Sequence, residues 1–494
     1  MPGFARTYRR SGLIDFLDWS VQSFSLDLCE ADHHAERKQR SLDDLRALMT
    51  MTDPERVVGT VPVPQPPDKQ PSSGMQKRVL AGGGIGQFIE FYDFTLYGLS
   101  AVTLAKLFFP GGSTLAGLLA TFATFGVAFF VRPLGGLFFG ALGDRIGRRK
   151  VLFVTLLAIG LATAMIGLLP TYASIGIAAP VLLVVCRLIQ GFSAGGESVG
   201  APAFVFEHAP LDRRGFWLNI TIAATALPSV VGGTLILVLS SAMPSEAFLA
   251  YGWRIPFLLA LPLAIFGVWI RTKTEESEAF KQVLAKHEHD EYSPIRETFR
   301  ENKVRMAQVI FVMGLTAMGF YFLSGYFVSY VQTSGNLSRD QSLLVNAVAM
   351  AFYALLLPIG GIIGDRVGRK PMLIAGSAAL AILSVPCFML VTSGSLPLAM
   401  VGQLLFVIPL CIYGGGCYTF FVEVFTTATR FTSAAISYNV AYALFGGTAP
   451  FIGTMLVSMT EKSSAPGYYM AAAAVIVLLL LVFTRVPETR RRVG

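Results

Sequence analysis

Residues 132–150 read RPLGGLFFGALGDRIGRRK. An apolar segment that carries Arg132 ends in a short basic turn, and a second apolar segment starts at Val151. Glycine permits the sharp bend of such a turn and lets two helices approach closely. Asp144 is the acidic residue of the turn, and four cations follow it: Arg145, Arg148, Arg149 and Lys150. The stretch predicts two consecutive apolar helices joined by a tight basic turn.

The same stretch occurs a second time. Residues 358–370 read PIGGIIGDRVGRK, and Asp365 lies 221 residues after Asp144. A second pair of segments, FVFE ending at Glu207 and FVE ending at Glu423, repeats with an offset of 216 residues. Two halves with a nearly constant offset indicate an internal duplication, which many membrane transporters have.

The composition indicates a membrane protein. Of the 494 residues, 53% are hydrophobic and 14% are charged, and the mean hydropathy is +0.60. About 20 mostly apolar residues span a bilayer. We predict an all-α membrane protein with twelve transmembrane helices near residues 79–107, 115–142, 151–169, 178–207, 215–240, 254–271, 305–331, 341–363, 371–392, 397–424, 432–458 and 466–484.

The helices divide into two pseudo-symmetric six-helix bundles. We predict bundles at residues 78–271 and 305–485, joined by a polar cytoplasmic linker at 272–304. Residues 1–77 are polar and rich in proline towards their end, which is typical of a disordered extension, and residues 486–494 form a short tail. Cytoplasmic loops of membrane proteins carry an excess of Lys and Arg. With both termini cytoplasmic, the inner loops hold 22 of these residues and the outer loops four, so we expect a multi-pass protein of the inner or plasma membrane.

Five motifs together resemble a known family. The duplicated Gly-Asp-Arg turn resembles the major facilitator superfamily. Four further motifs are similar to the metabolite:proton symporter family within it: EFYDF at 90–94, RPLGG at 132–136, QGFSAGGE at 190–197 and GWRIPF at 252–257. The resemblance covers residues 78–490 and implies the facilitator fold. It also implies carriage of a dicarboxylate, citrate, shikimate, proline or betaine.

Few ionisable residues lie within the apolar segments, and such residues are commonly functional. Glu90 and Asp93 are three residues apart and therefore share one face of the first helix. Glu197 lies in the glycine-rich fourth helix. A carboxylate in a low-dielectric cavity can hold a proton at neutral pH. We predict Asp93, Glu90 and Glu197 as proton-coupling residues; the alternative is that they form structural ion pairs with arginine.

Two buried arginines are candidates for substrate binding. Arg132 lies about 18 Å along its helix from the Asp144 turn, near the middle of the membrane. Arg187 lies in the fourth helix. A guanidinium group is always charged and presents a planar fork that suits a carboxylate. The alternative is internal neutralisation of these arginines by Glu90, Asp93 or Glu197.

The second half offers polar aromatic and amide side chains instead of charges. From these we predict Tyr321 on helix seven and Asn439 on helix eleven as substrate-binding residues. Gly314, Gly319 and Gly325 are expected to interrupt helix seven, as glycine does in many transporter helices. The cysteines in apolar runs have no metal-ligand spacing, and we predict no metal and no cofactor.

The resemblance implies that the two Asp-Arg turns hold the inner side of the carrier shut. The predicted gating residues are Gly143, Asp144, Arg145, Gly147, Arg148, Gly364, Asp365, Arg366, Gly368 and Arg369. The negative charge of an aspartate stabilises the N-terminus of a neighbouring helix, which makes this role reasonable. We expect additional latches between Glu207 and Arg213 or Arg214, and between Glu423 and Arg430.

The sequence thus predicts a secondary transporter that couples proton entry to uptake of a small organic anion by alternating access. A zwitterion such as proline or betaine is the alternative substrate. The osmosensing members of the family carry a long C-terminal coiled coil, for which residues 486–494 are too short. A polytopic membrane enzyme would need paired acids or metal ligands that the short outer loops do not supply. We expect a monomer in the lipid bilayer that binds no nucleic acid.

Overall fold

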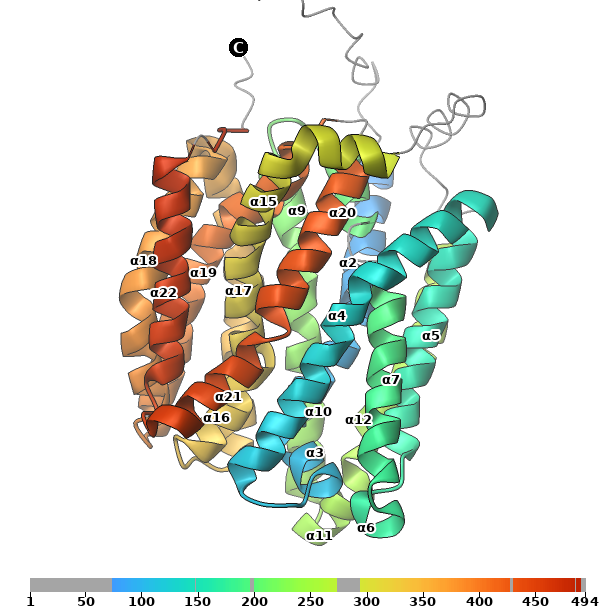
Figure 1. The fold of residues 1–494 in the computed structure, drawn as a ribbon, viewed down its shortest axis with the longest axis vertical. Helices are drawn as coiled ribbons and strands as arrows, with labels where there is room; N and C mark the ends of the chain where they lie inside the picture. The colour runs from blue at the N-terminus through green and yellow to red at the C-terminus, as the bar shows by residue number, and fades with distance from the viewer. Residues whose placement is uncertain are drawn as a thin grey trace, which may run out of the picture. The chain divides into compact units, whose positions relative to one another are not determined.

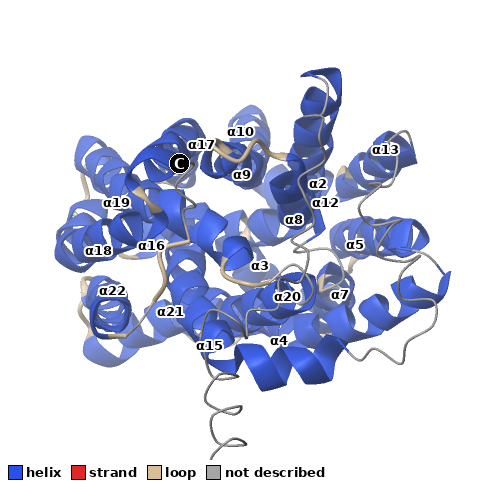
Figure 2. Ribbon diagram, turned by 90° about the horizontal axis from the view of Figure 1, so that it is seen from above, coloured by secondary structure: helices blue, strands red, loops and turns tan. Residues whose placement is uncertain are grey.

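The computed structural model describes residues 73–146, 148–195, 200–272, 294–426, 430–484 and 486–489. In these ranges the regular secondary structure is helical (Figure 2). Most of the extension predicted for residues 1–77 and most of the linker predicted for 272–304 lie outside them. Residues 73–77 and 294–304 are described and belong to helices.

The first half folds into six consecutive helical segments, as predicted. Several of them consist of two to four shorter elements. In chain order the elements are α2 (Ser73–Leu99), α3 (Ala101–Phe108), α4 (Thr114–Ile146), α5 (Arg148–Leu168), α6 (Tyr172–Ile175), α7 (Ala178–Ala194), α8 (Gly200–His208), α9 (Arg214–Ala223), η1 (Ala224–Ala226), α10 (Leu227–Ala242), α11 (Ser245–Ala247), η2 (Phe248–Gly252), α12 (Arg254–Leu258) and α13 (Ala260–Thr272).

The second half repeats this arrangement with longer, less divided helices (Figure 1). Its elements are α15 (Pro294–Tyr321), η3 (Phe322–Tyr326), α16 (Phe327–Thr333), α17 (Arg339–Val367), α18 (Arg369–Val391), α19 (Leu396–Glu423), α20 (Arg430–Ala441), η4 (Tyr442–Gly446), α21 (Ala449–Thr460) and α22 (Ala465–Phe483). The twelve segments confirm the predicted fold class, two six-helix bundles of the facilitator type.

Hydropathy within the described residues agrees with twelve membrane spans. Nine helical segments are long and apolar enough to cross a membrane, and two shorter apolar stretches are Phe153–Leu168, which is part of α5, and Ala178–Ala194, which is α7. The remaining segment consists of α2 and α3. Its hydropathy is reduced by the polar residues Gln87, Glu90 and Asp93.

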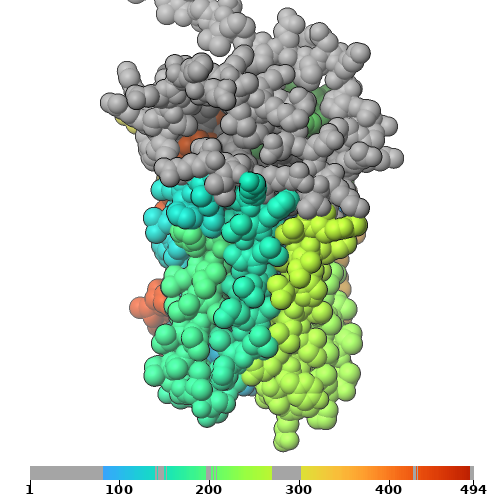
Figure 3. Space-filling view, turned by 90° about the vertical axis from the view of Figure 1, so that its right-hand side faces the viewer, coloured from blue at the N-terminus to red at the C-terminus, as the bar shows by residue number. Residues whose placement is uncertain are grey.

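Large apolar side chains are exposed on the outer surfaces of the helices. Figure 3 shows one such face, formed by α5, α7 and residues 245–272. Exposed side chains on these elements include Leu161, Val181, Ile265, Phe266 and Trp269. A surface of this kind would be costly in water and is expected where a helix faces lipid.

Two predicted helix starts and one predicted interruption were wrong. The sixth segment begins at Ser245 instead of near 254, because the π-helical turn η2 extends it. The seventh begins at Pro294 instead of near 305. Gly314 and Gly319 do not interrupt helix seven: α15 is continuous to Tyr321, and the helix changes to the π-helical turn η3 only at Phe322. π-Helical turns are rare and often lie at functional sites.

Glycine brings α4 and α7 into direct backbone contact. A side-chain carbon at Gly191 would lie 1.9 Å from the Ala128 carbonyl oxygen, and one at Gly195 would lie 1.9 Å from the Arg132 carbonyl oxygen. Only glycine fits at such distances. This close contact fixes the helix that carries Arg187 against the helix that carries Arg132.

Candidate functional site

A buried ion pair joins α4 to α2 in the first bundle. Arg132 on α4 donates a hydrogen bond from Nη2 to Glu90 Oε1 on α2 at 2.7 Å, and both side chains are 1% exposed. The Arg132 guanidinium also lies over the rings of Phe94 and Phe129, at 5.1 and 5.5 Å from their centroids. Glu90 thus neutralises the charge of Arg132, which is one of the alternatives stated from the sequence.

Arg187 occupies a different environment. Its guanidinium carbon lies 4.2 Å from the Tyr97 ring centroid, 5.0 Å from that of Phe94 and 5.1 Å from that of Phe125. Its Nη1 donates to Gln190 Oε1 at 2.9 Å. Among the described residues, its Nε and Nη2 atoms have no hydrogen-bond partner although the side chain is fully buried. Arg187 therefore keeps two unused donors in a site enclosed by aromatic rings.

Asp93 lies near Arg187 but does not form a hydrogen bond with it. The Asp93 side chain is 2% exposed, and neither carboxylate oxygen has a hydrogen-bond partner among the described side chains. The Asp93 charge interacts electrostatically with Arg187 and, more weakly, with Arg132. An unpaired buried carboxylate is costly, so this group has a strong tendency to bind a proton or a polar partner.

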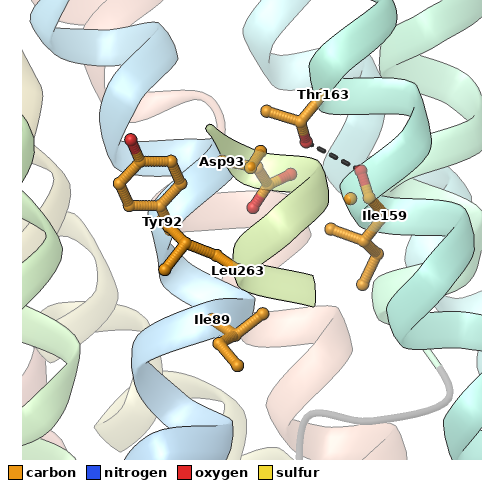
Figure 4. Close-up of a pocket in the computed structure, with 8 residues that line it drawn as sticks. Ile89, Tyr92, Asp93, Ile159, Thr163 and Leu263 are labelled. Atoms are coloured by element: carbon orange, nitrogen blue, oxygen red, sulfur yellow. Dashed lines mark hydrogen bonds between the residues drawn. The ribbon is translucent and has the colours of Figure 1, made fainter. Parts of the chain in front are cut away.

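Asp93 also lines a small cavity between α2, α5 and α13, which has room for about one water molecule. Figure 4 shows the Asp93 carboxylate projecting from α2 towards α5, where Thr163 and Ile159 lie. Thr163 Oγ1 accepts a hydrogen bond from Gln190 Nε2 at 2.8 Å and donates to the Ile159 carbonyl at 2.8 Å. The sequence interpretation gave neither polar residue a role in the site, although Gln190 begins the QGFSAGGE motif. The position of Gln190 three residues after Arg187, on the same helix face, was the available signal.

The second bundle contributes aromatic rings to the same region. The Tyr321 ring packs edge-on against Phe125 and Phe129 of α4, with centroid distances of 5.6 and 5.1 Å. Its hydroxyl group is buried and has no hydrogen-bond partner among the described residues. Tyr442 lies 6.0 Å from Tyr321. Tyr321 is thus in contact with the rings that surround both arginines.

Asn439 lies about one helical turn away from this centre. A side-chain carbon at Gly136, four residues after Arg132, would lie 3.7 Å from Asn439 Nδ2. The Asn439 side chain is buried, and its Oδ1 atom has no hydrogen-bond partner in the described part of the chain. Of the four predicted substrate residues, Arg132 and Arg187 lie on α4 and α7, whereas Tyr321 and Asn439 lie on α15 and α20 beside α4.

One end of the helices, where α17 ends and α18 begins, carries a contact between the two bundles. We call it the α17–α18 end. The Asp365 carboxylate accepts hydrogen bonds from the backbone N–H groups of Gly215 at 2.8 Å and Phe216 at 2.9 Å, in the first turn of α9. Gly215 and Gly361 also meet so closely that a side-chain carbon at Gly361 would lie 2.5 Å from the Gly215 carbonyl oxygen. A carboxylate at a helix N-terminus is favourable, so Asp365 ties the second bundle to the first.

Arg369 connects this contact to the end of the chain. It donates from Nη1 to Asp365 at 2.9 Å and from Nε to Glu423 at 3.2 Å. Thr489 donates to Glu423 at 2.8 Å, and Glu488 accepts from the backbone N–H groups of Arg369 and Lys370. The ion-pair partner of Glu423 is therefore Arg369 and not the expected Arg430. The sequence interpretation also overlooked Glu488 and Thr489, since it treated them as a tail.

Arg430 and Arg214 share an aromatic partner. Their guanidinium carbons lie 5.1 and 4.2 Å from the centroid of the Phe206 ring, on α8 of the first bundle. Because Arg430 belongs to the second bundle, Phe206 forms another contact between the bundles at the α17–α18 end. A cation over an aromatic face contributes about 0.5–1 kcal/mol or more when desolvated.

The structure does not describe the first copy of the turn in the same detail. Gly147 and Glu197 lie outside the described residues. Gly143, Asp144 and Arg145 lie in the last turn of α4, and Arg148 begins α5. The placement of the side chains of Asp144, Arg145, Arg148 and Glu207 is not described. In the second copy, Gly364, Asp365 and Arg366 end α17, and Gly368 forms the turn with φ of +115°.

The bundles also touch towards the opposite end. A side-chain carbon at Gly98 would lie 3.0 Å from the Gly325 Cα atom, so α2 and η3 are in backbone contact. Asp340 at the start of α17 accepts hydrogen bonds from Ser240 at 2.7 Å and Ser241 at 3.4 Å. Contacts near both ends enclose the central arginines between the bundles.

The chain matches proteins of known type over most of its length. Residues 83–493 match the family described as "Sugar (and other) transporter". The chain is 36% identical over 408 residues to a proline/betaine transporter from Salmonella typhimurium, covering 80% of this chain and 81% of the relative. It is 35% identical over 386 residues to a citrate-proton symporter from Salmonella typhi, covering 78% and 88%.

Solved structures show the same fold. The partially occluded, inward open conformation of the xylose transporter XylE from E. coli aligns with a TM-score of 0.67 at 17% identity. The alignment covers 85% of this chain and 100% of that one. At this identity the likeness concerns the fold alone. The family match and the two relatives, each covering more than two thirds of the chain, identify this protein as a member of the sugar (and other) transporter family of the major facilitator superfamily.

Proposed function

We propose that this protein is a proton-coupled symporter that takes up a small organic acid by alternating access. The observation that carries the proposal is the pair Asp93 and Arg187. Both are fully buried and electrostatically coupled, and both keep unused hydrogen-bonding groups. Intramembrane charges of this kind commonly mark substrate and proton sites. The proline/betaine and citrate-proton relatives support the same class of activity.

In this proposal Asp93 and the substrate carboxylate alternate as the partner of Arg187. When Asp93 is ionised, its charge compensates the guanidinium. When Asp93 binds a proton, Arg187 is left without a counter-charge in a low-dielectric site, which is costly. A substrate carboxylate then supplies the missing charge through the Nε and Nη2 donors. Proton and anion consequently bind together better than either binds alone, which is positive coupling between two sites.

Arg132 and Glu90 have a different role. Their 2.7 Å ion pair is internally neutral. We propose that it orients the Phe94 ring, which lies against both arginines, and the Phe129 ring, which lies against Arg132. Tyr321 and Asn439 face the arginines from the second bundle and are proposed to bind the rest of the substrate. Glu197 remains a further proton-site candidate by its position in the sequence.

A zwitterion such as proline or betaine is the second candidate substrate. The rings of Phe125, Phe129, Tyr321 and Tyr442 form one connected group beside Arg187. An aromatic face attracts an alkylated ammonium group. A zwitterion could therefore place its carboxylate on Arg187 and its ammonium group on these rings.

The remaining proposals concern topology. We place the α17–α18 end on the cytoplasmic side with both termini, because the loops on that side hold most of the Lys and Arg residues. The bundles at 78–271 and 305–485 would rock about the central site, with Asp365, Arg369 and Glu423 closing the cytoplasmic side. We propose a monomeric carrier in the cell membrane without enzymatic activity.

The test uses purified protein in proteoliposomes with a pH indicator in the external medium. Citrate, succinate, proline and betaine are added one at a time, and labelled uptake is followed in parallel. We expect the organic acids to be accumulated while the external medium becomes more alkaline, and a protonophore to abolish the accumulation. If only proline and betaine act in this way, the second candidate holds. Uptake without any proton movement would refute symport.

A further inference from the structure

We propose that the cavity between α2, α5 and α13 binds a single water molecule, and that Thr163 positions this water against Asp93. The inference rests on the proposed role of Asp93 as the proton site. The inference gives Asp93 a bound water as a hydrogen-bond partner, on the side of α2 that faces α5 and α13. It also assigns a role to Thr163, which lies outside the sequence motifs.

The size and lining of the cavity fit one water. Ile89, Ile159, Gly160, Ala260 and Leu263 form apolar walls, and Tyr92, Asp93 and Thr163 supply the polar atoms. A buried water needs at least two polar partners. The Tyr92 hydroxyl group already donates to the Pro256 carbonyl at 2.9 Å. The Tyr92 oxygen can still accept a hydrogen bond, but Asp93 and Thr163 already supply the two partners that one water needs.

The hydrogen-bond inventory of Thr163 determines how it can hold the water. Its single hydroxyl proton goes to the Ile159 carbonyl, and one of its lone pairs accepts from Gln190. A hydroxyl group has two lone pairs, so one remains. The water can donate one proton to this lone pair and the other to the Asp93 carboxylate. When Asp93 carries a proton, the water can turn and accept it. The same water therefore suits both protonation states of Asp93.

This water would complete a polar chain around the proton site. The chain runs from Asp93 through the water to Thr163, from Thr163 to Gln190, and from Gln190 to Arg187. Asp93 and Arg187 would then be linked through hydrogen bonds as well as by charge. Thr163 acts through the water and is a positioning residue.

Several charged or titratable groups surround Asp93 and must be considered in any test of pH dependence. Arg187 on α7 and Arg132 on α4 interact with its charge, Glu90 and Tyr92 lie on its own helix, and Tyr321 faces it from α15. The cavity residues named on α5 and α13 carry no charge. Substitution of Thr163 therefore leaves all the charged neighbours in place.

The decisive variant is Thr163→Val, which keeps the side-chain shape and removes the hydroxyl group. Loss of one hydrogen bond that supports a charged group is expected to move the pH midpoint of proton-driven uptake upwards by about one unit, a tenfold change. Counterflow exchange should persist. Thr163→Ser should restore the parent profile. Thr221→Val is the matched control, since this buried hydroxyl group donates only to the carbonyl of Trp217 in its own helix.

A second variant keeps the test independent of the folding of Thr163→Val. Ala260→Val adds two methyl groups to the cavity wall, excludes the water and leaves the Thr163 hydroxyl group in place. We expect it to produce the same shift. Parent-like pH profiles in both variants would overturn the inference. Asp93→Asn, measured in parallel, separates this failure from failure of the proposed function: if Asp93→Asn loses accumulation while both cavity variants behave like the parent, only the water site is refuted.

Discussion

Substitution of Asp365 by asparagine should weaken the contact between the two bundles at the α17–α18 end, so that the bundles separate there more often. The Asp365 carboxylate accepts two backbone N–H groups at the start of α9 and one guanidinium donor from Arg369. An amide can accept some of these hydrogen bonds but has no charge, and its NH₂ group would face another donor. The variant therefore loses at least one charge-assisted hydrogen bond, about 1.5–3 kcal/mol, and part of the favourable interaction with the helix N-terminus.

If the free energy that favours the closed state of this end falls by about 2–3 kcal/mol in total, the population of the open state increases about 30- to 150-fold. The reporter is a cysteine introduced at Asn219, in a chain whose own cysteines have been replaced. Asn219 is buried on α9 one turn from Gly215, and its Cβ atom lies close to Gly361. A maleimide reagent should label this cysteine faster by about the same factor.

The matched control is Asp212→Asn. Asp212 lies at the same end of the helices, but its ion pair with Arg213 is solvent-exposed. Such exposed pairs contribute little, so its labelling rate should equal that of the parent. Equal labelling rates in Asp365→Asn and the parent would refute the role of Asp365 as a latch between the bundles.

Three further predictions concern the central arginines and the gate. Arg187→Lys keeps the charge but loses the planar fork of donors, so substrate affinity measured by thermal stabilisation should fall about ten- to hundredfold. Arg132→Lys should mainly lower the melting temperature, because it disturbs the ion pair with Glu90. Equal affinity in Arg187→Lys and the parent would refute the binding of the substrate carboxylate by Arg187. Phe206→Leu removes the ring that Arg214 and Arg430 share, and should raise the labelling rate of the Asn219 cysteine by about two- to fivefold; an unchanged rate would contradict this contact. Asp144→Asn, the counterpart of Asp365→Asn in the first copy of the turn, should impair uptake while membrane insertion stays normal, and normal uptake would remove its gating role.

The sequence was sufficient to predict the fold because the bilayer imposes a strong pattern. A run of about 20 apolar residues leaves few alternatives to a spanning helix, and the repeated turn at Asp144 and Asp365 fixed the division into halves. The predicted start of the sixth helix, near residue 254, was wrong because the π-helical turn η2 (Phe248–Gly252) continues the helix before that point. Glycine at 314 and 319 was interpreted as a break, but both residues lie in close contact with side chains of neighbouring helices.

The site could be predicted only as a set of residue types. Buried charges are rare enough to single out Glu90, Asp93, Arg132 and Arg187. Which acid pairs with which arginine depends on the rotation of each helix about its axis, and a single sequence does not fix this rotation. Thr163 was overlooked because a threonine in an apolar helix commonly forms a hydrogen bond with its own backbone and needs no other partner.

The contacts of the chain end were also beyond sequence reasoning. Glu488 and Thr489 bind residues more than 60 positions away, at the start of α18 and the end of α19. No periodicity in residues 486–489 indicates such partners. Arg430 was predicted as the partner of Glu423, but the partner in the structure is Arg369. This prediction was wrong because the sequence does not show which helices are neighbours.

The most direct test of proton coupling compares accumulation with exchange in Asp93→Asn proteoliposomes. Accumulation against a gradient needs net proton movement, whereas counterflow exchange of labelled for unlabelled substrate does not. We predict that the variant loses accumulation and keeps exchange at a rate close to that of the parent, with Asp212→Asn unchanged in both. Accumulation that survives in both Asp93→Asn and Glu90→Gln would place the proton site elsewhere and contradict the mechanism proposed for Asp93 and Arg187.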